Sequence, residues 1–201
     1  MKKKKVAIFI FDNVEVLDFA GPFEVFSSVR LSKKIYSNIL DLPKPIKVFT
    51  VTERKSHIQA TGGLHIKGNY TINKSPKPDI LIIPGGIGTR KLLNNQKVIN
   101  WILNHKEIEL LCSVCTGSLL LAKAGLLKNK KATTHWGAFS ILKQISPSTK
   151  IITHKRFVKD TYITSAGVSA GIDMSLYIVE QLYGKTIAKN TSRYMDYKFQ
   201  Y

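Results

Sequence analysis

The chain has 201 residues, of which 44% are hydrophobic and 22% charged, and its formal net charge is +18 at pH 7. These values are typical of a single soluble globular domain over residues 1–201, and they exclude a disordered, collagen-like or coiled-coil chain. The apolar runs are far shorter than the roughly 20 residues of a membrane span, and the basic N-terminus lacks the long apolar core of a secretory signal, so we expect a cytoplasmic protein with no membrane segment.

The positive charge is carried mainly by lysine, since only five of the 31 basic residues are arginine. Proteins that read nucleic-acid sequence favour arginine, because its planar fork binds bases and phosphates in a bidentate way. The lysines are spread along the whole chain. We therefore expect a generally solvating surface and no specific nucleic-acid partner, with nonspecific binding of polyanions as the alternative.

Strand-like and helix-like segments alternate from the N-terminus onward. In the first half of the chain, the pattern predicts a strand over 6–11, a helix opened by Pro22 and running to about residue 31, a surface connection over 32–45, a strand over 46–51, a hairpin over 57–70 around two glycines, a strand over 79–83 and a helix over 91–104.

The second half continues the alternation. It predicts a strand over 109–112, a helix over 116–124 stopped by Gly125, a short strand over 132–134, a helix over 138–145, two short strands within 150–164, and helices over 170–183 and 187–194. The whole pattern predicts an α/β three-layer sandwich with a mostly parallel central sheet. Ligands of such sheets bind outside the C-terminal ends of the strands, where residues 12–22, 84–88 and 113–117 fall.

Residues 110–118 have the layout of a nucleophile elbow, in which a strand runs through a tight turn into a helix that begins with small residues. Cys115 occupies the turn and is the candidate nucleophile. A helix N-terminus behind the turn favours thiolate over thiol. Cys112 lies within the strand, so we expect a buried structural residue there. The two cysteines form a C-x-x-C only formally, and the chain offers no second pair of ligands for a metal.

A glycine-rich segment, Pro84-Gly85-Gly86-Ile87-Gly88, follows a predicted buried strand. Glycines at this place let the backbone turn sharply, and we expect them to leave N–H groups free. The amides of Gly86 and Thr116 together would then bind an oxyanion.

Two carboxyl groups and one histidine are further candidates. Asp18 lies among apolar residues near the start of a helix, where it would cap that helix, face the solvent, or share a proton with the Cys115 sulfur as a general acid. We favour the role of general acid, and Glu24 could also point inward from the helix. His135 stands 20 residues after Cys115 and could act as a base, although a lone histidine is more often structural. Asp173 opens an apolar helix and is expected to be a structural cap or backbone anchor.

Together these motifs resemble the DJ-1/PfpI superfamily, whose fold is the flavodoxin-like fold of the class I glutamine amidotransferases. The resemblance extends from residue 6 to about residue 194. The motifs that carry it are D-x-x-G-P-x-E-V at 18–25, P-G-G-x-G at 84–88, C-T-G-S at 115–118, A-x-A-G-L-L at 122–127, T-T-H-W at 133–136 and S-A-G-V-S-A-G-I-D at 165–173.

Within the superfamily, the chain looks most like the isonitrile hydratase branch and the amidotransferase-like sensor domains of AraC-type regulators. The catalytic set of the hydratase branch is an aspartate, a cysteine and the threonine after it, which match Asp18, Cys115 and Thr116. PfpI-type proteases carry histidine directly after the cysteine, where this chain has threonine. The resemblance implies a homodimer. The chain lacks a Rossmann glycine motif and a P-loop, so no cofactor is expected.

Three functions therefore stay open. The first is hydration of an isonitrile to an N-formamide. The second is action on small aldehydes, as in the glyoxalase and deglycase branch; His135 fits that branch in spacing, but Asp18 stands where the branch has glutamate. The third is a noncatalytic sensor in stress response, in which Cys115 responds to oxidation or to a ligand.

Overall fold

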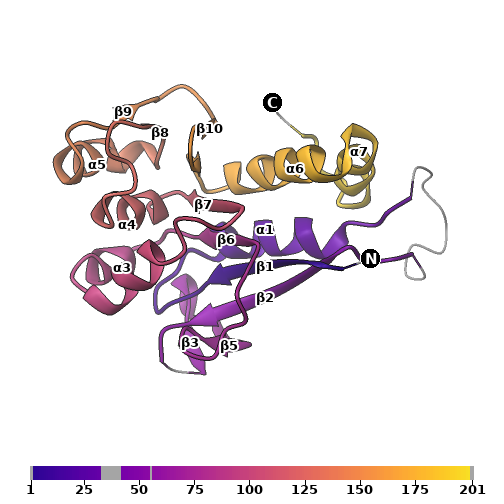
Figure 1. Cartoon of the computed structure of the whole chain (residues 1–201), viewed down its shortest axis with the longest axis horizontal. Helices are drawn as coiled ribbons and strands as arrows, with labels where there is room; N and C mark the ends of the chain where they lie inside the picture. Colours follow the sequence, from indigo (N-terminus) through magenta and orange to yellow (C-terminus); the bar gives the residue numbers. More distant parts are fainter. Residues whose placement is uncertain (1, 33–41, 55, 200–201) are drawn as a thin grey trace.

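The computed structural model describes residues 2–32, 42–54 and 56–199, and within them seven strands form a central sheet (Figure 1). The strands are β1 (Lys4–Phe9), β2 (Ile46–Thr52), β5 (Tyr70–Thr71), β6 (Ile80–Ile83), β7 (Leu110–Val114), β10 (Phe157–Lys159) and β11 (Ile163–Ser165). Their order across the sheet is β10-β11-β7-β6-β1-β2-β5. All neighbouring pairs are parallel except β10 and β11.

The buried stretches of the central strands are mostly apolar because both faces of the sheet are covered. All four residues of β6 are completely buried, as are residues 6–9 of β1. The predicted α/β sandwich with a mostly parallel sheet is confirmed.

Two groups of helices cover the sheet (Figure 1). One group packs together as α1 (Val16–Ser28), α6 (Ala170–Tyr183) and α7 (Lys185–Tyr194). The other consists of α2 (Thr89–Leu92), α3 (Gln96–Leu103), α4 (Gly117–Lys123) and α5 (Phe139–Ile145). No helix in the described part of the chain is both long and apolar enough to cross a membrane.

Two small sheets lie outside the central one. The antiparallel pair β3 (His57–Gln59) and β4 (His65–Lys67) forms the predicted hairpin, and Gly62 in its connection has a φ of 78°. The hairpin ends at Lys67, before the predicted end at residue 70, because Tyr70 pairs with β2 as part of β5 in the central sheet. The second pair is parallel and joins β8 (Lys131–Ala132) to β9 (Lys150–Ile151).

Three predicted elements need correction. Helix α1 begins at Val16, so Pro22 lies inside the helix and not at its first turn; there it lacks the N–H donor, and its ring crowds the carbonyl of Asp18. The helix predicted over 91–104 is divided into α2 and α3, because the Asn95 side chain accepts a hydrogen bond from the Val98 amide at 3.2 Å and starts a new helix there. Residues 150–164 contain strands β9, β10 and the first residues of β11, which is three strands where two were predicted. Residues 33–41 of the predicted surface connection lie outside the described residues.

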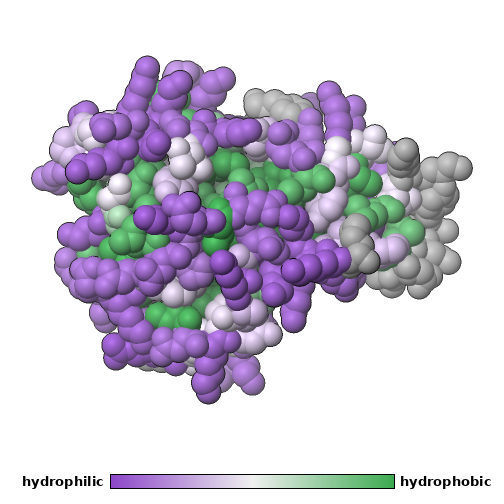
Figure 2. Space-filling view, viewed as in Figure 1, coloured by the Kyte–Doolittle hydropathy of each residue, from purple (hydrophilic) through white to green (hydrophobic). Residues whose placement is uncertain are grey.

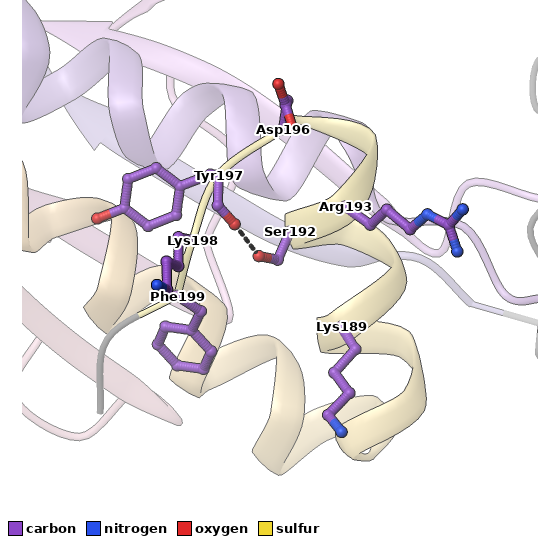
Figure 3. A pocket seen from close by; sticks show the side chains of 7 residues that line it. All are labelled: Lys189, Ser192, Arg193, Asp196, Tyr197, Lys198 and Phe199. Atoms are coloured by element: carbon purple, nitrogen blue, oxygen red, sulfur yellow. Dashed lines mark hydrogen bonds between the residues drawn. The ribbon is translucent and has the colours of Figure 1, made fainter.

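The chain after α7 folds back onto that helix. The Ser192 hydroxyl donates to the Tyr197 carbonyl, and the Tyr197 amide donates to the Ser192 carbonyl at 2.9 Å (Figure 3). Figure 3 also shows Lys189, Arg193 and Phe199 around a small surface pocket beside this turn. Residues 195–199 are therefore packed against the domain.

The surface is mainly hydrophilic on the face that Figure 2 shows. On the face shown in Figure 2, hydrophilic side chains cover most of the area, and apolar residues are visible only between them.

The two glycines at the ends of α4 serve different purposes. A Cβ on Gly117 would lie 2.0 Å from the Ile83 carbonyl oxygen, so only glycine lets the end of β6 approach the start of α4. Gly125 has a φ of 76° and open space around its Cα, as the predicted helix stop requires.

We predict that Gly117→Ala lowers the free energy of unfolding by about 3 kcal/mol or more, because the added methyl overlaps backbone that cannot move cheaply. Gly125→Ala is the matched control and should cost only about 1 kcal/mol, since it adds backbone strain without a clash. Urea denaturation followed by tryptophan fluorescence measures both. Equal losses in the two variants would contradict the assigned close approach.

Candidate active site

Cys115 occupies the sharp turn between β7 and α4. Its φ is 54°, a left-handed conformation that is uncommon for any residue other than glycine and that costs of the order of 1 kcal/mol. The Cys115 amide donates to the Ser165 carbonyl at 3.0 Å, so the neighbouring strand β11 holds the turn. This arrangement is the predicted nucleophile elbow. The side chain is buried, and the residue is only 6% exposed.

The Asp18 carboxyl reaches the same place from the first turn of α1. The residue is completely buried, and its Oδ2 accepts a hydrogen bond from the Gly85 amide at 2.9 Å. Among the described residues, no nitrogen or oxygen pairs with its Oδ1. The Cys115 thiol is the remaining hydrogen-bonding neighbour of this carboxyl. The capping alternative for Asp18 is wrong, because Glu15 occupies the N-cap position of the helix.

Burial raises the pKa of both acidic groups. The pKa of Asp18 rises to about 7, because the loss of water outweighs the Gly85 amide and the Cys115 thiol, which lower it. The pKa of Cys115 rises to about 12, through burial and then the negative charge of Asp18, against the lowering effect of Thr116. The expectation of a resting thiolate is therefore wrong: desolvation and the adjacent carboxylate prevail over the start of a seven-residue helix.

The glycine loop lies against Thr116. A Cβ on Gly85 would be 2.5 Å from the Thr116 nitrogen, so glycine is required there. The Gly86 amide donates to Thr116 Oγ1 at 3.0 Å, and the Thr89 hydroxyl donates to the same oxygen at 3.2 Å. The expectation of free loop amides is therefore wrong for Gly85, which binds Asp18, and for Gly86, because buried N–H groups take partners within the protein. The Thr116 amide donates toward the Cys115 sulfur.

Glu24 and His135 are not brought to the thiol. Glu24 is exposed and accepts a hydrogen bond from the Ser28 hydroxyl at 2.7 Å, which corrects the inward orientation expected for it. His135 is partly exposed, its Nδ1 accepts from the Gly137 amide at 3.3 Å, and its ring centroid lies 5.0 Å from that of Trp136. Its neighbour Thr134 makes the contact instead, since the Thr134 hydroxyl donates to the Cys115 carbonyl at 3.0 Å.

The structure adds Gly167 to the site. Gly167 has a φ of 72°, and a Cβ there would lie 2.4 Å from the Cys115 Cβ. Within the small-residue motif over 165–173, this glycine therefore packs directly against Cys115. The contact of Thr134 with Cys115 could not be predicted from the sequence, because in the motif over 133–136 only His135 is a typical catalytic residue type.

The remaining candidates are structural. Cys112 is completely buried, as expected, and burial raises its pKa to about 12. Asp173 is also completely buried, but it does not cap α6, whose N-cap is Ser169; it forms an ion pair with Arg156. Within the described ranges, no group of three or more His, Cys, Asp or Glu side chains is placed to hold a metal ion.

We predict that Asp18→Asn stabilises the protein increasingly as the pH rises. A carboxyl whose folded pKa is raised from 3.8 to about 7 loses stability as the pH rises through that interval, because the unfolded chain ionises first. The gain of the variant over the wild type should therefore widen by about 3 kcal/mol between pH 5 and pH 8.5. Urea denaturation at the two pH values measures the gap.

Asp160→Asn is the matched control for this experiment. The amides of Lys131 and Thr161 lower the pKa of Asp160, so removal of its charge should bring no gain that grows with pH. A gap for Asp18→Asn that does not change with pH would contradict the assigned shift.

The comparisons with known proteins agree with this geometry. The DJ-1/PfpI family matches residues 4–181. Isonitrile hydratase from Pseudomonas putida is 30% identical over 195 residues, which are 96% of this chain and 78% of that protein. The HTH-type transcriptional regulator GbdR from Pseudomonas aeruginosa is 23% identical over 97% of this chain, and the chain spans about half of that regulator (51%).

Solved structures show the same fold. A THiJ/PfpI family protein from Pseudomonas syringae has a TM-score of 0.85 and 29% identity, with 100% of this chain and 78% of that chain covered. DJ-1beta from Drosophila melanogaster has a TM-score of 0.81 at 19% identity, with 98% and 100% covered. Given the family match over most of its length and the elbow at Cys115, this chain belongs to the DJ-1/PfpI family.

Proposed function

We propose that the protein hydrates isonitriles to N-formamides, with Cys115 as the nucleophile and Asp18 as the carrier of the proton. The observation that carries this proposal is the buried pair itself: a carboxyl with a pKa of about 7 beside a cysteine thiol in a strained turn. The relative named isonitrile hydratase supports it at 30% identity. Among the described residues, no histidine is hydrogen-bonded to either group.

The reaction requires a nucleophile and an acid at the same atom. The terminal carbon of an isonitrile accepts the attacking sulfur and also the proton, so the acid must lie beside the thiol. Asp18 meets this requirement, because it takes the proton from the Cys115 sulfur and delivers it to the carbon. The product of this step is a thioimidate. The sulfur has formed the C–S bond, the carbon lone pair has taken the proton to form the C–H bond, and one π pair of the triple bond has become the lone pair on nitrogen.

Water completes the conversion. Its oxygen adds to the thioimidate carbon and one proton goes to the nitrogen, which leaves a tetrahedral adduct. The C–S bond then breaks, the hydroxyl proton returns to the sulfur through Asp18, and an N-formamide leaves. The Thr116 amide, which donates toward the sulfur, stabilises the charge that develops on the sulfur when the thiol loses its proton and when the C–S bond breaks.

A ligand-sensing role is the second candidate, favoured by the likeness to GbdR. A sensor would bind an isonitrile or another small electrophile at Cys115 without turnover. Aldehyde chemistry with His135 as the base has less support, since the His135 ring is engaged with Gly137 and Trp136.

We predict that the wild type produces N-formamide from a simple alkyl isonitrile and that Cys115→Ala lowers kcat by on the order of 10³-fold or more, because the covalent step is lost. Cys112→Ala is the matched control and should retain activity within a few-fold. His135→Ala should do the same. N-formamide formation by the wild type and each variant is measured by mass spectrometry. Equal activity in wild type and Cys115→Ala would refute the proposal.

We also predict that kcat/KM rises with pH to a plateau, with an inflection near the Asp18 pKa of about 7. Below that pH both groups hold protons and the thiol has no acceptor; above it the carboxylate can receive the thiol proton. Asp18→Asn should remove this inflection and lower kcat/KM by about 10²- to 10⁴-fold. A variant that keeps the wild-type pH profile would show that Asp18 carries no proton.

A further inference from the structure

The loop over residues 165–169 lies against Cys115 and is fastened at both ends. At its start, the Ser165 carbonyl accepts from the Cys115 amide at 3.0 Å. In its middle, Gly167 approaches so closely that a Cβ there would be 3.1 Å from the Cys115 sulfur. This loop is therefore one wall of the thiol's surroundings, and whatever holds it also determines how deeply the sulfur is buried.

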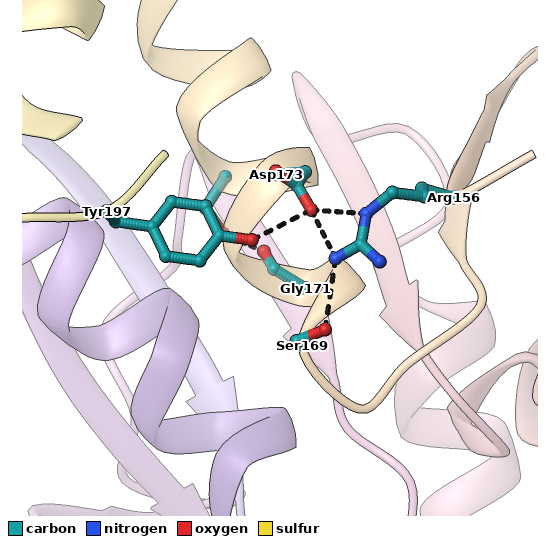
Figure 4. Close-up of polar contacts among 6 residues, drawn as sticks. Arg156, Ser169, Gly171, Asp173 and Tyr197 are labelled. Carbon is teal, nitrogen blue, oxygen red and sulfur yellow. Dashed lines mark hydrogen bonds and ion pairs between the residues drawn. The ribbon is translucent and has the colours of Figure 1, made fainter. Parts of the chain in front are cut away.

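Arg156 touches this loop at two points. Its backbone carbonyl accepts from the Ala166 amide at 2.8 Å, and its Nη2 donates to the Ser169 hydroxyl at 3.0 Å. The same guanidinium binds Asp173, through Nε at 2.6 Å from Oδ2 and through Nη2 (Figure 4). Asp173 is completely buried in the first turn of α6, so its carboxylate holds the Arg156 guanidinium in one orientation beside the loop.

We propose that Arg156 and Asp173 form a positioning pair for the nucleophile, which presses the loop 165–169 against Cys115. The proposal rests on Cys115 being the reactive residue of the proposed function. A buried ion pair alone is weak evidence for stability, since burying two charges costs about as much as their attraction returns. Here the pair connects three segments around Cys115. Arg156 directly precedes β10, Asp173 lies in the first turn of α6, and the Arg156 side chain links both to the loop 165–169 through Ser169.

The consequence of losing the pair is specific. Burial is the main cause of the raised pKa of Cys115. A loosened loop would admit water to the sulfur, increase the thiolate fraction at neutral pH and speed alkylation, because the thiolate is the nucleophile. Productive contact between the thiol and Asp18 would become rarer at the same time, so turnover would fall while alkylation rises.

Two mild variants test the pair. Arg156→Lys keeps a charge for Asp173 but cannot also reach Ser169 with a planar fork, and Ser169→Ala removes the loop's end of the same contact. Tyr197→Phe is the matched control, because the Tyr197 hydroxyl donates to the same Asp173 oxygen at 3.1 Å from the side opposite Arg156 (Figure 4). The probe is iodoacetamide at pH 7.5, and mass spectrometry follows Cys115 and Cys112 separately.

Cys112 serves as an internal indicator of unfolding, since it is completely buried on the same strand. We expect Cys115 alkylation to become about 3- to 10-fold faster in Arg156→Lys and in Ser169→Ala, with Cys112 unchanged in both and neither cysteine changed in Tyr197→Phe. The double variant should add little to either single one, because both remove the same contact. Unchanged rates at Cys115, a parallel rise at Cys112, or an equal rise in Tyr197→Phe would each overturn the proposal.

This test reads the thiol and needs no substrate. If the wild type fails to convert an isonitrile but the variants expose Cys115 selectively, the hydratase function fails and the positioning pair stands. If conversion occurs and the variants leave both kcat and the alkylation rate unchanged, the hydratase function stands and the pair is only structural.

Discussion

The Asp18 carboxyl lies buried between the Gly85 amide and the Cys115 thiol, and this contact joins three segments that are far apart in the sequence. Helix α1 supplies the acid, the loop after β6 supplies the amide, and the turn after β7 supplies the sulfur. All three lie at the C-terminal ends of neighbouring parallel strands, which is where sheets of this type bind ligands. The single amide donor is too weak to offset the loss of water, and the carboxyl therefore keeps its proton up to about pH 7.

The contact between Asp18 and Cys115 lowers the stability of the fold at the pH at which the proposed reaction needs it. A carboxyl that must ionise in a buried place destabilises the folded state at the pH where it would work, and the left-handed turn at Cys115 adds backbone strain. The domain tolerates both because its sheet is apolar on two faces and the elbow is held from several sides. Ser165 accepts from the Cys115 amide, Thr134 donates to its carbonyl, and Gly167 closes over its side chain.

Close backbone approach explains the glycines at three positions of this chain. Gly85, Gly117 and Gly167 each lie where a methyl group would overlap atoms of the elbow or of the strand beside it. Thr116 fills the space between the loop and the helix with a hydroxyl that accepts from the Gly86 amide. The Thr116 hydroxyl therefore holds the glycine loop, while its backbone amide donates toward the Cys115 sulfur.

The alternation of apolar strands and amphipathic helices by itself determined the α/β class, the parallel sheet, the elbow and the nearness of Asp18 to Cys115, because these follow from local periodicity and from the rule that parallel strands end at one edge. Only the tertiary structure decided which loop amides have partners within the protein and which way the Glu24 and His135 side chains point. It also decided that burial raises the pKa of both Asp18 and Cys115. Those properties depend on burial and on partners distant in the chain, such as Gly86 with Thr116 and Arg156 with Asp173. Local sequence carries no measure of desolvation, and desolvation here outweighs the helix terminus that favours a thiolate.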